Sequence, residues 1–64
     1  MPYSTNSSLP SAVRDNLPEH AQSIYREAFN SGYEQTHNET RAAKIGWSAV
    51  SRDYKKRDGK WVKR

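Results

Sequence analysis

The sequence predicts a mainly helical fold, a compact three-helix domain with a small C-terminal β-hairpin. Two Leu-Pro dipeptides, at residues 9–10 and 17–18, each precede a short helical pattern. Further along, apolar residues recur at steps of four and three in two longer segments, which is the spacing of a helix packed on one side. An Asp-Gly dipeptide at residues 58–59 is a typical turn between two antiparallel strands.

The composition limits the size of the core and the kind of function. The chain has 64 residues, which allow one domain, and only 33% of them are hydrophobic, so the core is small. The chain contains no cysteine, which excludes disulfides, thiolate nucleophiles and cysteine-based zinc sites. A chain of this size is too small for a pocket-forming enzyme, and we expect a binding or regulatory module.

The first two elements are predicted from the prolines. Residues 1–8 are polar and form an extended arm, which Tyr3 anchors if its ring packs on the core. The arm is also a candidate third strand beside the hairpin. Proline suits the first position of a helix and pushes the preceding residue out of the helical region. The first helix therefore spans residues 10–16, with Ala12 and Val13 facing inward.

A second helix is predicted over residues 18–34. Its apolar face consists of Leu17, Ala21, Ile24 and Ala28, widened by Tyr25, Phe29 and either Gly32 or Tyr33. Glu19 lies near the start of this helix, where a negative charge interacts favourably with the helix dipole.

The third helix is predicted over residues 37–54. Thr36 and Glu39 fit a capping box, in which a threonine is followed three residues later by a glutamate. The apolar stripe is formed by Ala43, Trp47, Val50 and Tyr54. Small residues beside the stripe allow another helix to approach closely, and they are Ala42, Gly46 and Ala49. The opposite face is polar and basic.

Residues 55–64 are predicted to form a basic hairpin or tail. Both flanks of the Asp-Gly turn are weak strands, and an isolated hairpin is only marginally stable in water. Trp61 and Val62 can fold back onto the core and hold it. Trp61 also lies among cations, so its ring can serve either as a plug for the core or as a platform for stacking on a base.

The charge is divided unevenly along the chain. Residues 1–39 hold two cations against five carboxylates, a net charge of −3, whereas residues 40–64 hold nine cations against two carboxylates, a net charge of +7. Such a division indicates an anionic partner at the basic end, although surface cations also serve simply to solvate small domains. The candidate polyanion-binding residues are Arg41, Lys44, Arg52, Lys55, Lys56, Arg57, Lys60, Trp61, Lys63 and Arg64.

Catalysis and metal binding find no support in the sequence. His20 and His37 lie at opposite ends of the second helical segment, roughly 25 Å apart, and one chain cannot bring them to the same metal. The serines lack a recognisable nucleophile elbow, and neither a glycine-rich phosphate loop nor an EF-hand spacing is present. We therefore predict no catalytic residue, no metal and no cofactor.

The sequence also predicts a cytoplasmic protein. No apolar run approaches the ~20 residues that span a bilayer. Residues 1–6 have neither the basic nor the apolar region of a signal peptide. The absence of cysteine fits a reducing compartment.

Several motifs together resemble the ChaB family, small proteins described as regulators of cation transport. The matching elements are Pro2-Tyr3, Leu9-Pro10, Val13, Leu17-Pro18, His20-Ala21-Gln22, Ile24-Tyr25, Ala28-Phe29-Asn30, Trp47, Ala49-Val50, Tyr54, Lys56 and Trp61. The resemblance covers nearly the whole chain, and the string from Leu17 to Asn30 is its most specific part. Family members often carry a longer charged insertion where this chain has only Glu34 to Asn38.

The resemblance implies a compact, mainly helical regulator without established catalytic residues. Family members are linked by name to a calcium/proton antiporter, and viral relatives are described as DNA-associated. Two functions therefore remain open. The basic end binds nucleic acid, DNA in preference to RNA, or it docks on an acidic protein surface and regulates a cation antiporter or another host protein. An enzyme is the weakest alternative, because no nucleophile has a base within reach.

Overall fold

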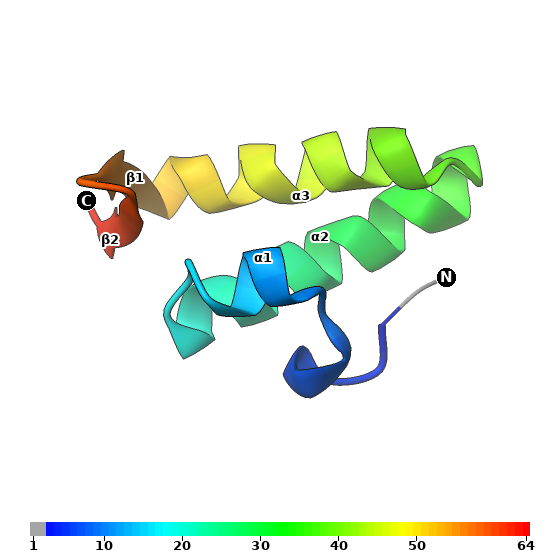
Figure 1. Cartoon of the computed structure of the whole chain (residues 1–64). Coiled ribbons are helices and arrows are strands. Elements are labelled where there is room, and N and C mark those ends of the chain that lie inside the picture. Colours follow the sequence, from blue (N-terminus) through cyan, green and yellow to red (C-terminus); the bar gives the residue numbers. More distant parts are fainter. Residues whose placement is uncertain (1–2) are drawn as a thin grey trace.

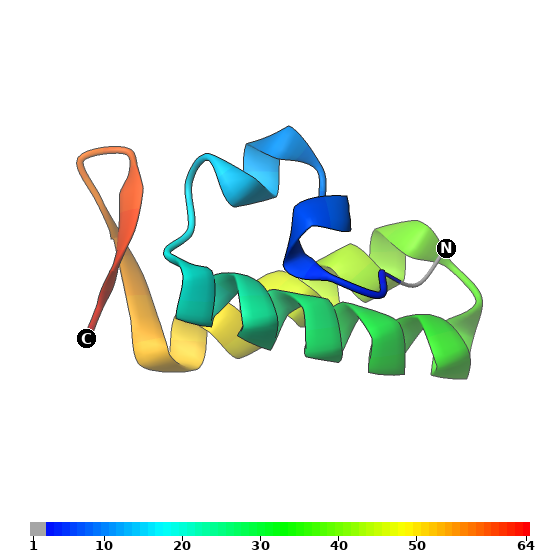
Figure 2. The same ribbon diagram turned by 90° about the horizontal axis from the view of Figure 1, so that it is seen from below.

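The computed structural model describes residues 3–64, and it contains three α-helices followed by a two-stranded hairpin (Figure 1). The elements in order are the 3-10 helix η1 (Asn6–Ser8), α1 (Ser11–Arg14), α2 (Glu19–Thr36), α3 (Glu39–Asp53), β1 (Tyr54–Arg57) and β2 (Lys60–Lys63). Helices α2 and α3 lie side by side and antiparallel, and the hairpin stands at the end of α3 (Figure 2). The predicted fold class is confirmed.

The first helix is shorter than the predicted range of residues 10–16. Pro10 and Pro18 have extended ψ angles of 150° and 161°, so each precedes its helix as the cap and is not the first helical residue. The side-chain amide of Asn16 donates a hydrogen bond to the carbonyl of Ala12 at 2.6 Å. This bond satisfies a carbonyl at the end of α1, and the proline at position 18 disfavours a helical conformation just before it.

The N-terminal segment neither stays fully extended nor joins the sheet. Residues 6–8 form one turn of 3-10 helix, and the sheet has two strands within the described residues. The segment binds α2 instead, because the Asn30 amide accepts from the Tyr3 N–H and donates to the Tyr3 carbonyl, each at 2.8 Å. The Tyr3 ring lies 5.0 Å from the Phe29 ring, so the predicted anchor is confirmed. Residues 1 and 2 of the predicted arm lie outside the described residues.

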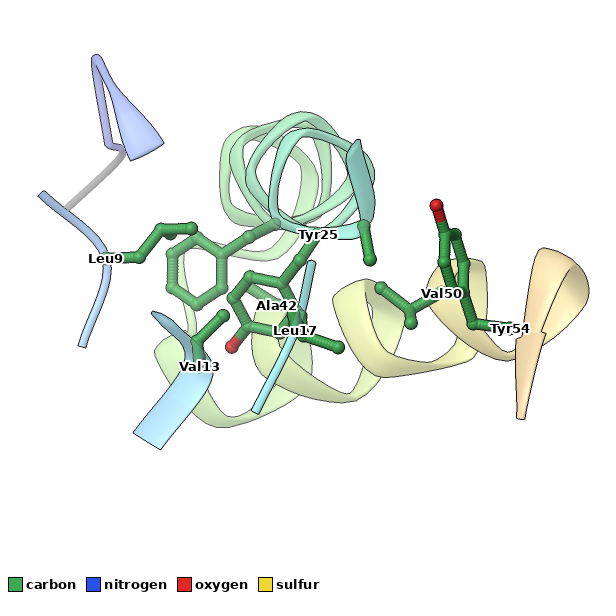
Figure 3. Packing of buried hydrophobic residues seen from close by; sticks show 9 residues of the cluster. Leu9, Val13, Leu17, Tyr25, Ala42, Val50 and Tyr54 are labelled. Atoms are coloured by element: carbon green, nitrogen blue, oxygen red, sulfur yellow. The ribbon is translucent and has the colours of Figure 1, made fainter. Parts of the chain in front are cut away.

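The core lies between α2, α3 and the segment that carries α1. Figure 3 shows α2 end-on, with Leu9 and Val13 on one side of the core and Val50 and Tyr54 on the other. Burial, assisted by the neighbouring Tyr3, raises the pKa of the Tyr25 phenol above its ordinary value. The buried hydrophobic residues are Leu9, Val13, Leu17, Ala21, Tyr25, Phe29, Ala42, Val50 and Tyr54.

The two long helices approach each other closely at glycines. A Cβ atom at Gly46 would lie 2.8 Å from the ring of Tyr25, and one at Gly32 would lie 2.8 Å from Cδ1 of Ile45. Ala42, Gly46 and Val50 are the buried residues of α3. The predicted role of the small residues is thus confirmed. The predicted apolar stripe, however, does not coincide with the buried face of α3, because Ala43 and Trp47 are only half-buried.

The capping box predicted at the start of α3 is wrong. His37 adopts a left-handed conformation, with φ of 51°, and ends α2 one residue after Thr36. The Thr36 hydroxyl donates to the carbonyl of Gly32 and so belongs to α2. Asn38 is the cap of α3, since its Oδ1 accepts a hydrogen bond from the N–H of Arg41 at 3.0 Å.

This cap gives a first testable prediction. We expect Asn38→Ala to lower the free energy of unfolding by about 1 kcal/mol, because it removes the acceptor for the first turn of α3. Asn38→Ser keeps an acceptor and is expected to change stability by less than about half as much. Urea denaturation followed by circular dichroism measures both. An equal loss from the two variants would show that the cap bond is not the cause.

The hairpin has the predicted Asp-Gly turn but begins one residue earlier than predicted. Tyr54, predicted as the last residue of the third helix, is the first residue of β1. Asp58 and Gly59 have φ angles of 51° and 81°, as a tight hairpin turn of the primed type requires. The hairpin is fixed to the rest of the chain by Trp61, whose backbone N–H donates to the Asn16 carbonyl at 3.3 Å.

Candidate polyanion-binding surface

The strand register divides the hairpin into two faces. The opposed pairs are Tyr54 with Lys63, Lys55 with Val62, Lys56 with Trp61, and Arg57 with Lys60. Side chains alternate between faces along a strand, so the first and third pairs share one face and the second and fourth pairs share the other. Tyr54 is buried and Trp61 is half-buried against the core. The face that they share with Lys56 and Lys63 is therefore the inner hairpin face. Lys55, Arg57, Lys60 and Val62 form the outer hairpin face.

The outer hairpin face concentrates positive charge around an apolar centre. Its three cations are exposed, and Val62 is also exposed, at 37%. Arg57 and Lys60 are directly opposed across the strands, and opposed like charges destabilise a strand pair. A bound anion relieves this repulsion, so the face is well suited to bind a polyanion.

Trp61 serves mainly as a core contact, in agreement with one of the two predicted roles. Its ring stacks on Trp47, with ring centroids 5.5 Å apart and planes inclined by 25°. Trp47 in turn meets the Tyr25 ring edge-on at 5.0 Å. This chain of rings joins the hairpin to the buried core. The stacked face of Trp61 is therefore occupied and is not offered to a nucleic-acid base.

Arg64 also has a structural role that the sequence did not reveal. Its backbone N–H donates to the Asp53 carbonyl at 2.8 Å, and its Nε donates to the Ser51 carbonyl at 2.9 Å. These carbonyls lie in the last turn of α3, where helix carbonyls lack partners within the helix. Arg64 therefore stabilises the helix end.

The remaining predicted cations are available for binding. Arg14, Arg26 and Arg64 are three of the eleven Lys and Arg residues, and their side chains are bound to other parts of the chain. Within residues 3–64, the other eight make no side-chain hydrogen bond and no ion pair with a carboxylate. These eight are Arg41, Lys44, Arg52, Lys55, Lys56, Arg57, Lys60 and Lys63, and all of them are exposed.

The structure does not place all predicted residues on one surface. Lys44 and Arg52 line a groove of about 520 Å³ whose walls come from α2 and α3, whereas Arg41 does not line it. Ile45 also lines this groove and is exposed at 38%, a residue that the sequence analysis missed. The sequence does contain a signal for Ile45. A large apolar residue that lies off the apolar stripe of its helix is not needed for the core, and such a residue can indicate a contact surface.

The histidines lie where the sequence placed them, at the two ends of α2. His20 is exposed beside the Tyr54 ring, at 6.4 Å, and His37 ends the helix. Within residues 3–64, no group of three His, Cys, Asp or Glu side chains is arranged to hold a metal ion. None of the helices described here is both long enough and apolar enough to cross a bilayer.

Comparisons with known proteins agree with one another. The family model described as ChaB matches residues 9–64. The chain is 44% identical to the "Putative cation transport regulator ChaB" of Escherichia coli strain K12, and the alignment covers 100% of this chain and 99% of the relative. The proteins of the same name from Escherichia coli O157:H7 and Shigella flexneri match to the same extent.

A solved structure gives the same result. The structure titled "NMR solution structure of the putative cation transport regulator ChaB" is 43% identical, covers 98% of this chain and superposes with a TM-score of 0.87. The sequence alignment has 75 positions against 64 residues here, so the relatives carry residues that this chain lacks. The family model, the relatives and the fold point the same way, and the chain belongs to the ChaB family.

Proposed function

We propose that this chain is a non-enzymatic regulatory protein of the cytoplasm, which binds an acidic surface of a cation-transport protein through the outer hairpin face. The relatives are named as cation transport regulators, which supports a role in regulation. The single observation that carries the binding site is the set of three exposed cations, Lys55, Arg57 and Lys60, on one face of the hairpin.

The chemistry of this face fits a protein surface. Val62 lies among the three cations and supplies an apolar contact, as the centre of a protein interface usually does. Complementary charges around such a contact accelerate association and select the partner. The stacking of Trp61 on Trp47 removes one feature that would favour single-stranded nucleic acid.

The test uses two variants of equal charge on opposite faces of the hairpin. Arg57→Gln/Lys60→Gln removes two cations from the outer face, and Lys56→Gln/Lys63→Gln removes two from the inner face. Each is added to everted membrane vesicles that contain a calcium/proton antiporter, and the exchange rate is followed with a pH-sensitive dye. We expect the concentration for half-maximal effect to rise about tenfold for the outer variant, because two surface charge contacts sum to about 1.4 kcal/mol.

The inner variant is the matched control, and we expect it to shift this concentration less than twofold. An equal loss from both variants would show that only net charge matters, and it would remove the outer face as the binding site. An exchange rate that the wild-type chain leaves unchanged would overturn the regulatory proposal itself.

Nucleic-acid binding is the second candidate, favoured by the same cluster of exposed cations. With three cations on the outer face, a duplex would be held by about three phosphate contacts, and log K would fall with log salt at a slope near −3. Fluorescence anisotropy with a mixed-sequence duplex measures that slope. Tight binding with this slope, together with an unaffected antiporter, would select nucleic acid over the protein partner.

A further inference from the structure

The groove between α2 and α3 is separate from the outer hairpin face. All the residues that line it belong to α2 and α3, so neither the N-terminal segment, nor α1, nor the hairpin contributes to it. Its surface combines an apolar part, made by Ala28, Ile45 and Ala49, with two serine hydroxyls and two cations.

Ile45 forms the exposed apolar contact of this groove. Its Cδ1 lies so close to Gly32 that a Cβ atom there would be only 2.8 Å away. Because Gly32 has no side chain, the Ile45 side chain packs directly against α2 at this position. The isoleucine is 38% exposed, and only one other large hydrophobic residue within residues 3–64 is classed as exposed. Small neighbours such as Ala28 and Ala49 leave space for a partner backbone to approach.

The two cations of the groove favour a partner that carries negative charge. Lys44 and Arg52 both line the groove, and neither side chain has a carboxylate or hydrogen-bond partner among residues 3–64. They are eight residues apart on α3, about 12 Å along the helix axis at ~1.5 Å per residue. Ile45 directly follows Lys44 and lies about 10 Å from Arg52 along the axis, at ~1.5 Å per residue. A partner that matches this pattern carries an acidic group with an apolar group beside it, and a second acidic group about 12 Å away.

An α-helix meets this requirement with few residues. In a helix that lies along α3, acidic side chains eight positions apart are separated by the same ~12 Å. An apolar side chain one position after the first acid lies beside it, seven positions from the second acid, as Ile45 lies relative to Lys44 and Arg52. Helices that dock into grooves commonly use anchors at such spacings. We propose that the α2–α3 groove binds an acidic amphipathic helix, whose apolar side chain packs on Ile45 and whose carboxylates pair with Lys44 and Arg52.

This inference does not depend on the proposed function, since it uses a different surface. The probe is a helical peptide of 14 residues with glutamate at its third and eleventh positions and leucine at its fourth. The control is a permuted peptide of the same composition, in which the two glutamates and the leucine stand at other positions. Binding to the full chain is followed by amide chemical shifts in NMR spectra. We expect the first peptide to shift amides along the groove, and the permuted peptide to bind at least tenfold more weakly.

Two variants locate the site on the chain. Ile45→Gln and Lys44→Gln/Arg52→Gln are each expected to weaken binding of the peptide at least tenfold. The matched controls are Val62→Gln and Lys56→Gln/Lys63→Gln, which are expected to weaken it less than twofold. Should Ile45→Gln fail to fold, the charge variant alone still decides, because Lys44 and Arg52 are exposed.

Three outcomes would overturn the proposal. The first is a set of shifts confined to the hairpin, which would leave the proposed function intact and remove the groove as a site. The second is equal binding of the two peptides, which would indicate charge attraction without a defined site. The third is that vesicles of anionic phospholipid shift the groove amides while the peptide does not, which would make a lipid surface the occupant. Conversely, failure of the outer-face variants in the antiporter assay would not affect the peptide result.

Discussion

Replacing Gly46 with valine is expected to lower the free energy of unfolding by about 3 kcal/mol, the upper end of the usual effect of overpacking. A Cβ atom at this position would lie 2.8 Å from two ring carbons of Tyr25 and 3.3 Å from its carbonyl oxygen. The ring cannot move aside, because Tyr25 is only 3% exposed and also contacts Phe29 and Trp47. The long helices must therefore separate to admit the side chain.

The measurement is urea denaturation, with the midpoint compared at equal slope. For a chain of 64 residues the total stability is about 3–10 kcal/mol, so the variant loses a large share of it. Ser48→Val is the control, since Ser48 is exposed on the same helix and the substitution tests only the effect of a β-branched residue there. A similar loss in the control would attribute the effect to helix propensity and not to the contact with Tyr25.

Replacing Trp47 with alanine is expected to have a comparable effect, a loss of about 3 kcal/mol. Trp47 is half-buried and its ring contacts two others, Tyr25 at 5.0 Å and Trp61 at 5.5 Å. The substitution removes both contacts, and with them the connection between the core and the hairpin. We expect a lower melting temperature and a loss of hairpin order together, seen by circular dichroism and by hydrogen exchange of the hairpin amides.

Trp61→Ala provides the comparison for this second prediction. It removes the stacking of the two tryptophans but keeps the contact between Trp47 and Tyr25, so we expect a release of the hairpin and a loss of about half the size. If Trp47→Ala left the melting curve unchanged, the Trp47 ring would not contribute to the stability of the fold and would be available to a ligand.

The helices were predictable because their determinants are local in sequence. The prolines at positions 10 and 18 set the starts of α1 and α2, and the apolar period of α2 is visible without tertiary information. The cap of α3 was not predictable in the same way. Thr36 and Asn38 are both good caps in sequence, and only the left-handed conformation of His37 decides between them.

The candidate surface was predictable in composition but not in arrangement. Nine cations after residue 40 are plain in the sequence, yet their division into an outer face, an inner face and a groove depends on strand register and on helix packing. The role of Arg64 depends on a contact with α3 at Ser51, thirteen residues earlier, which no local pattern signals. Ile45 was not predicted because it lies beside the apolar stripe of Ala43, Trp47, Val50 and Tyr54, and only the packing of α2 on α3 brings it into a groove.

The two-residue connection between α2 and α3 bears on how the chain folds. Residues 37 and 38 alone separate the helices, so the contacts nearest the turn join residues that are close in sequence, and pairing of the helices can extend from there. Helical chains rich in local contacts fold in microseconds to milliseconds. The contacts between Tyr3 and Asn30 and between Trp61 and Asn16 close much longer loops and are expected to form after the helix pair. We therefore expect the two ends of the chain to be added to a helical hairpin that assembles first.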